Sequence, residues 1–118
     1  MKYIIEGGNK LSGQIQAAGN KNAVFPTFAA ALLTDEEVIL ENVPEIEDTR
    51  VLISILETIG VDVKFKNHTV KIKAKKIKTK LPSELTSKLR GSLVLAGAIL
   101  ARCGKVSFFH PGGDVIGR

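Results

Sequence analysis

The sequence predicts a mixed α/β (α+β) protein assembled from a repeated unit of helices and strands. Apolar residues recur at helical spacing from position 51 to 59, and they alternate with charged residues from 61 to 72. In addition, residues 21–44 and 89–113 share one order of features: a helix rich in small residues, a tight connection, an apolar strand and a proline. These three observations predict two copies of a βαβαββ unit, the second of them incomplete.

The first predicted elements are two short strands, a helix and a third strand. Apolar runs at residues 2–6 and 13–17 flank a Gly-Asn turn region, which is typical of strands. Residues 23–33 are rich in Ala and Leu and predict a buried helix, in which Pro26 is tolerable because it lies near the first turn. Residues 37–42 then predict a strand that ends before a proline.

The clearest helix in the sequence covers residues 51–59. Acidic residues precede its apolar repeat, and Gly60 follows it. Alternating apolar residues on either side of an Asn67-His68 turn predict a hairpin with one exposed face.

A further helix is expected over residues 89–100, and a strand over residues 105–109. The helix contains several small residues that permit close approach to its neighbours. The strand leads into a closing loop that begins Pro-Gly-Gly, a combination that favours turns and lets the backbone approach a ligand.

Composition excludes several classes of protein. With 44% hydrophobic residues the chain is not disordered, and its longest apolar stretches fall short of the roughly 20 residues that cross a bilayer. The N-terminus lacks the apolar core of a signal peptide. Cys103 is the only cysteine, which rules out an internal disulfide and a cysteine-rich metal site. We therefore expect a soluble, cytoplasmic protein whose length is sufficient for one domain.

Basic residues stand at two of the predicted helix starts. Lys21 and Asn22 stand just before the predicted helix of the first copy, where the helix dipole favours an anion, and Arg90 has a similar place in the second copy. Each also has a plainer interpretation, as an ordinary asparagine-capped helix start and as a solvated arginine. Spacing alone does not favour the anion site.

A single carboxylate, Asp114, lies in the closing loop. It could transfer a proton if burial under a ligand raised its pKa from about 3.9 toward neutrality. Aspartate is also a common turn residue, so a catalytic role needs independent support.

The net charge of +5 and a run of lysines between positions 71 and 80 raise the question of an anionic partner. Aromatic residues and reader motifs are missing from that run, which favours a solvated strand face. A basic α/β module that binds RNA stays open as an alternative, and retention on heparin that falls steeply with salt would favour it.

Four segments in order closely resemble the enolpyruvyl transferases: GNKNA at 19–23, NVPEIEDT at 42–49, LRGSLVLAG at 89–97 and PGGDVIG at 111–117. The resemblance spans essentially the whole chain. It implies a longer, two-lobed protein built from repeated βαβαββ units, with substrates bound between the lobes. In that plan residues 1–20 belong by structure to the other lobe and residues 21–118 form the first part of one lobe. The chain alone is then expected to be inactive.

The resemblance also implies a reaction and the residues that serve it. The enolpyruvyl group of phosphoenolpyruvate passes to the 3′-hydroxyl of UDP-N-acetylglucosamine with release of phosphate, the first committed step of peptidoglycan precursor synthesis, with no cofactor or metal. Lys21 and Asn22 match residues that bind phosphoenolpyruvate, and Arg90 matches one associated with the UDP-sugar. Asp114 stands where most members carry a catalytic cysteine and is expected to be the proton donor. The sister enzyme acting on shikimate 3-phosphate, which shares fold and chemistry, is the alternative; KNA and PGG-x-x-IG favour the UDP-sugar.

Aspartate at the cysteine position predicts insensitivity to fosfomycin. The epoxide of this inhibitor alkylates the thiolate of the family, and a carboxylate is a much weaker nucleophile. We expect the full-length enzyme to keep its activity at fosfomycin concentrations that inactivate its Asp114→Cys variant. A stable adduct on Asp114, detected by mass spectrometry, would refute this prediction.

Overall fold

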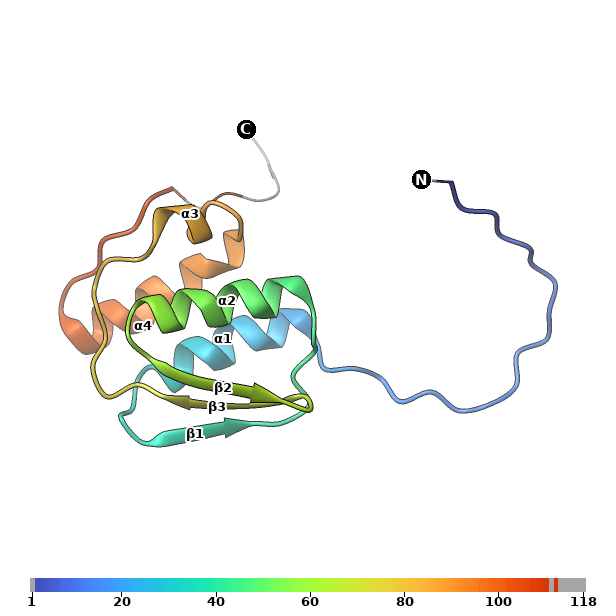
Figure 1. Cartoon of the computed structure of the whole chain (residues 1–118), viewed down its shortest axis with the longest axis horizontal. Coiled ribbons are helices and arrows are strands. Elements are labelled where there is room, and N and C mark those ends of the chain that lie inside the picture. The colour runs from blue at the N-terminus through green and yellow to red at the C-terminus, as the bar shows by residue number, and fades with distance from the viewer. Residues whose placement is uncertain (1, 111, 113–118) are drawn as a thin grey trace.

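Helices cover one side of a small antiparallel sheet in the computed structural model (Figure 1). The structure describes residues 2–110 and residue 112. Its elements are α1 (Lys21–Ala31), β1 (Glu37–Leu40), α2 (Glu47–Thr58), β2 (Asp62–Lys66), β3 (Thr69–Lys73), α3 (Ser83–Thr86), the 3-10 helix η1 (Arg90–Leu93) and α4 (Val94–Cys103). The run α1–β1–α2–β2–β3 is the predicted unit without its first strand, which confirms the α/β class.

The sheet has the strand order β1-β3-β2, and both pairings are antiparallel. The predicted hairpin joins β2 to β3 through Asn67 and His68, which adopt φ angles of 49° and 58°. Positive φ at both central residues is the geometry of a tight hairpin turn that matches strand twist. Along β3, Val70 and Ile72 are fully buried and Lys71 between them is exposed, so one face packs on the core.

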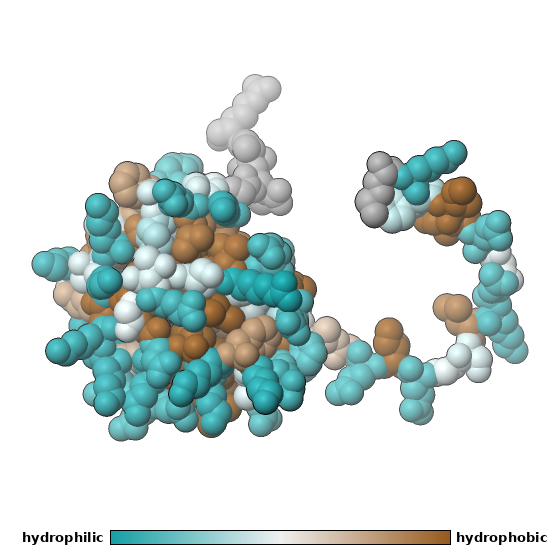
Figure 2. All heavy atoms as spheres, in the orientation of Figure 1, coloured by the Kyte–Doolittle hydropathy of each residue, from teal (hydrophilic) through white to brown (hydrophobic). Residues whose placement is uncertain are grey.

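The lysine-rich face of the sheet is solvated, as the sequence analysis favoured. Lys71 stands opposite Lys64 in the register of β2 and β3, and two like charges placed this way repel each other. Lys73 has Glu37 opposite it on one side and Asp62 on the other. Figure 2 shows hydrophilic residues over the lower part of the molecule, where the sheet lies.

The core lies between the helices and the inner face of the sheet. Its largest fully buried apolar side chains are Phe28, Leu32, Leu52, Ile55, Leu56, Ile59, Ile72, Leu81, Leu95, Ile99 and Val70. Four of these come from the helical repeat that predicted α2. That helix begins earlier than predicted, because Glu47 and Asp48 form its first turn, where the helix dipole favours acidic residues.

Helix α1 also begins earlier than predicted, at Lys21. Pro26 is therefore inside the helix, where it lacks the N–H that would bond to the carbonyl of Asn22. Lys21 and Asn22 become the first two residues of α1, and this places both in its first turn.

The predicted strands at residues 2–6 and 13–17 are wrong for this structure. Residues 2–15 follow an extended path away from the body of the molecule (Figure 1), and none of residues 2–20 pairs with a strand in the described chain. A single strand without a neighbour has no ladder of hydrogen bonds to hold it. The apolar side chains Ile4, Ile5 and Ile15 are 80%, 89% and 98% exposed as a result.

The strand predicted over residues 105–109 is reduced to one bridge. Ser107 pairs in parallel with Lys80, its N–H donating to the carbonyl of Thr79 at 2.7 Å and its carbonyl accepting from Leu81 at 2.9 Å. No longer ladder forms there among the described residues, so the prediction of a full strand is wrong. The helix that precedes it is confirmed, although it starts as η1 and ends at Cys103.

Arg102 on α4 secures the far end of α1. Its Nη1 donates to the carbonyl of Leu32 at 2.7 Å and to that of Thr34 at 2.8 Å. Carbonyls just past a helix end have no partner within the helix, so these bonds cap the C-terminal end of α1 and attach it to α4.

We predict that Arg102→Ala destabilises the fold by about 1–3 kcal/mol. Hydrogen bonds from a charged donor to partly buried carbonyl groups are stronger than hydrogen bonds between neutral groups. Urea unfolding followed by circular dichroism measures the change. Arg50→Ala is the matched control, because the Arg50 side chain makes an exposed ion pair with Glu45, at 3.1 Å, which is worth about 0–1 kcal/mol. Equal losses from the two variants would contradict the role given to Arg102.

Candidate functional site

The start of α1 is capped by its own sequence. Asn20 is the N-cap, and its Oδ1 accepts the N–H of Asn22 at 2.8 Å. The carbonyl of Asn20 accepts the N–H groups of Ala23 and Val24 at 3.1 and 3.3 Å. Because these amides are already bonded, an anion at this helix end would depend on the Lys21 ammonium and the helix dipole.

Lys21 forms an ion pair with a residue of the neighbouring helix. Its Nζ lies 3.0 Å from Oδ2 of Asp48, in the first turn of α2. The side chains are 53% and 35% exposed, so the pair lies at the surface and stays open to a ligand. The starts of α1 and α2 therefore meet at one point.

A close backbone contact fixes how these two helix starts approach each other. A Cβ on Gly19 would overlap the carbonyl oxygen of Asn42, and it would lie 3.1 Å from Cδ of Pro44. The same connection is tied to the hairpin: Val43 donates its N–H to the carbonyl of His68 at 2.8 Å, and its own carbonyl lies 3.1 Å from His68 Nδ1. Only glycine fits at position 19 in this arrangement.

Arg90 is brought toward the start of α1 by packing between helices. It is the first residue of η1 and is exposed. A Cβ on the next residue, Gly91, would lie only 2.8–2.9 Å from ring atoms of Phe25. Phe25 is one helical turn from Lys21, so this contact joins the elements that carry the two predicted cations.

Gly112, in the closing loop, lies against the last turn of α3. Gly112 donates its N–H to the carbonyl of Thr86 at 3.2 Å, and a Cβ on Gly112 would overlap the backbone of Ser87. These contacts hold Gly112 at the segment that leads into Arg90. Asp114, the predicted proton donor, lies outside the described residues.

The structure thus gathers three of the four predicted residues on neighbouring elements: Lys21 and Asn22 on α1, and Arg90 on η1. Asp48 was missed. It lies in the NVPEIEDT segment, one of the four that resemble the family, but the acidic residues there already had an explanation as a favourable helix start. Only the fold shows that one of them reaches Lys21.

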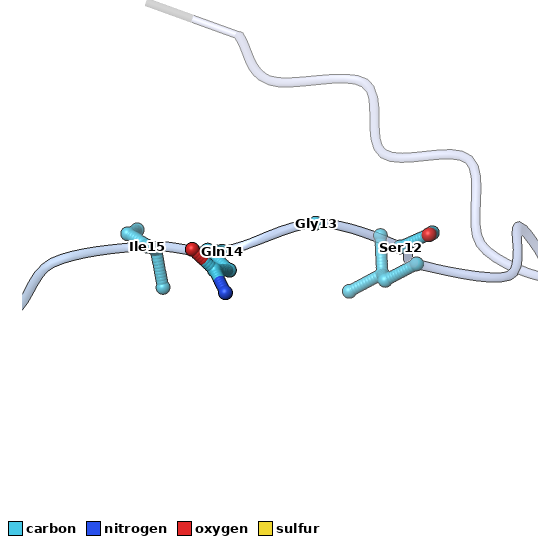
Figure 3. Close-up of a pocket in the computed structure, with 5 residues that line it drawn as sticks. Ser12, Gly13, Gln14 and Ile15 are labelled. Carbon is cyan, nitrogen blue, oxygen red and sulfur yellow. The ribbon is translucent and has the colours of Figure 1, made fainter.

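Surface hollows add little to this site. The hollow in Figure 3 is lined by residues 11–15 of the N-terminal segment alone, so no helix or strand supplies a wall. Another, of about 330 Å³, lies between the start of α1 and the end of β1. Within residues 2–110 and 112, no three acidic, histidine or cysteine side chains group in a way that could hold a metal ion. In the same part of the chain, no helix has the length and hydrophobicity of a membrane span.

Sequence comparison finds the same kind of enzyme repeatedly. The family model for EPSP synthase (3-phosphoshikimate 1-carboxyvinyltransferase) matches residues 5–118. The UDP-N-acetylglucosamine 1-carboxyvinyltransferase of Borreliella burgdorferi is 52% identical over 117 residues, and that of Bradyrhizobium diazoefficiens is 48% identical over 120 residues. These matches cover 98% and 100% of this chain but 27% and 28% of the relatives. The chain thus spans about a quarter of their length.

Structural comparison agrees. The enolpyruvyl transferase NikO from Streptomyces tendae superposes with a TM-score of 0.74 at 34% sequence identity. The superposition covers 83% of this chain and 23% of that structure.

We predict that Gly91→Ala disturbs the contact that brings Arg90 toward α1. The new methyl group would collide with the Phe25 ring, and such overpacking lowers the free energy of unfolding by about 1–3 kcal/mol. Gly97→Ala is the matched control: nothing lies within 4 Å of its Cβ, and alanine in a helix is favoured over glycine by about 1 kcal/mol. Equilibrium unfolding should therefore show opposite signs for the two variants.

Combining Gly91→Ala with Phe25→Leu makes the test specific. A smaller side chain at position 25 should restore part of the lost stability, which a double-mutant cycle measures as coupling. Additive losses would mean that the two residues do not interact as described.

Proposed function

Since the chain belongs to the EPSP synthase (3-phosphoshikimate 1-carboxyvinyltransferase) family, we propose that it is part of an enzyme that transfers the enolpyruvyl group of phosphoenolpyruvate to the 3′-hydroxyl of UDP-N-acetylglucosamine. The observation that carries this proposal is 52% identity over 98% of the chain to a relative named for that activity. Other relatives at 42–48% identity have the same name. This support, together with the KNA and PGG-x-x-IG segments, favours the UDP-sugar over shikimate 3-phosphate as acceptor.

The reaction makes two demands that the site residues can meet. Protonation of the methylene carbon of phosphoenolpyruvate leaves the neighbouring carbon cationic, and the sugar hydroxyl adds there with loss of its own proton. Departure of phosphate together with a proton from the new methyl group then restores the double bond. A proton donor must therefore lie over the alkene, and cations must hold the phosphate and carboxylate groups.

We assign these tasks to the residues predicted from the sequence. Lys21 and Asn22 bind phosphoenolpyruvate, and the planar fork of the Arg90 guanidinium binds oxygens of the UDP-sugar. Asp114 donates the proton. The packing of Phe25 on Gly91 supports one shared site for Lys21 and Arg90, because it joins the elements that carry them.

The N-terminal segment fits a two-lobed enzyme. We propose that residues 1–20 complete the other lobe and that residues 21–118 are the first part of their own lobe. The exposed apolar side chains at positions 4, 5 and 15 support this proposal, because burial against a neighbouring sheet would remove them from water. The cytoplasmic location and the lack of a nucleic-acid partner stay predictions.

Phosphate release by the full-length protein tests the proposed function. We expect release from phosphoenolpyruvate to require UDP-N-acetylglucosamine, and shikimate 3-phosphate not to replace it. Removing the proton donor in Asp114→Asn should lower the rate about 10²- to 10⁴-fold, the usual contribution of general acid catalysis. Asp114→Cys, which restores a donor, should keep measurable turnover. Full activity of the asparagine variant would disprove the role of Asp114.

A further inference from the structure

We propose that Asp48 is a positioning residue, which holds the Lys21 ammonium in the place where phosphoenolpyruvate binds. This inference rests on the proposed function and adds a residue to it. It starts from the 3.0 Å contact between Lys21 Nζ and Asp48 Oδ2.

The ion pair does little for the stability of the fold. Both side chains are partly exposed, and ion pairs in contact with water contribute little to folding. The backbone contact between Gly19 and Asn42 already holds the starts of α1 and α2 together. A weak pair at a junction that is already rigid has its main effect on where the lysine side chain points.

Lys21 can serve Asp48 and a ligand together. An ammonium group has three N–H donors, and a single carboxylate oxygen at hydrogen-bond distance occupies one of them. Two donors remain for an anionic ligand. The lysine stem is flexible, so holding it in one conformation beforehand removes ordering that binding would otherwise have to impose.

The charge of Asp48 acts in the opposite direction. A carboxylate beside the ammonium repels a ligand that carries phosphate and carboxylate groups. Positioning and repulsion thus predict opposite effects on phosphoenolpyruvate binding when Asp48 is replaced, which makes the inference testable. Our proposal is that positioning is the larger effect.

The other acidic residues nearby provide controls. Glu47 precedes Asp48 in the same helical turn and is exposed, but within the described chain it makes no ion pair with Lys21. Glu45 pairs with Arg50. Glu47→Gln therefore removes the same charge from the same helix start without touching the lysine.

The test compares Asp48→Ala, Asp48→Asn and Glu47→Gln in the full-length protein, with phosphate release measured against the concentration of each substrate. In Asp48→Ala we expect kcat/KM for phosphoenolpyruvate to fall about 10- to 100-fold, as misplacement of a binding group does. Asp48→Asn keeps an oxygen acceptor and should recover part of that loss. Glu47→Gln should keep the kinetic constants of the parent protein, and KM for UDP-N-acetylglucosamine should stay unchanged in all three. Each variant removes one charge from the first turn of α2, so the thermal unfolding midpoint should fall by a similar small amount in all three.

Three results would overturn the inference. Asp48→Ala could match Glu47→Gln, which would mean that the pair has no role. Both Asp48 variants could bind phosphoenolpyruvate more tightly, which would make Asp48 a competitor of the substrate. Loss of both substrates' binding together with an unfolding midpoint well below that of Glu47→Gln would make its role purely structural. Failure of the proposed function looks different: the parent protein itself would release no phosphate, and the role of Asp48 would fall with it.

Discussion

The packing of the Phe25 ring against Gly91 is the contact on which the candidate site depends. A side chain at position 91 would collide with the ring, so α1 and η1 come this close only because the residue is glycine. Lys21 lies one turn before Phe25, and Arg90 directly precedes Gly91. One steric contact therefore joins the two elements that carry Lys21 and Arg90, which are distant in the sequence. At the other end of α1, Arg102 bonds to the carbonyls of Leu32 and Thr34 and so attaches α1 to α4, the helix that continues from η1.

Sequence patterns correctly predicted the elements whose structure depends on residues close together in the chain. The apolar repeat of α2 and the positive-φ turn between β2 and β3 are both features of neighbouring residues, and both are present. The strands predicted at residues 2–6, 13–17 and 105–109 failed for a common reason. A strand exists only with a partner, and the sequence of the strand itself does not say whether that partner is in the chain.

The site residues also divide into those that a local motif identifies and one that only a contact between distant segments identifies. Lys21, Asn22 and Arg90 were identified because they stand in motifs that resemble a known family. Asp48 was not identified, because an acidic residue in the first turn of a helix already has a sufficient local reason. Its contact with Lys21 depends on how Gly19 and Asn42 meet, and no pattern within either segment contains that information. The net charge was a poor guide, since Lys64 and Lys71 lie on the exposed sheet face, away from the helix starts.

A crystal structure of the full-length protein with phosphoenolpyruvate and UDP-N-acetylglucosamine bound tests the central claim most directly. If α1 and η1 present one site, the Lys21 ammonium contacts the phosphoenolpyruvate anion and Arg90 contacts the nucleotide sugar beside it, with Phe25 still packed on Gly91. Substrates bound away from both cations, or a complex in which only one of the two cations faces the ligands, would contradict the account.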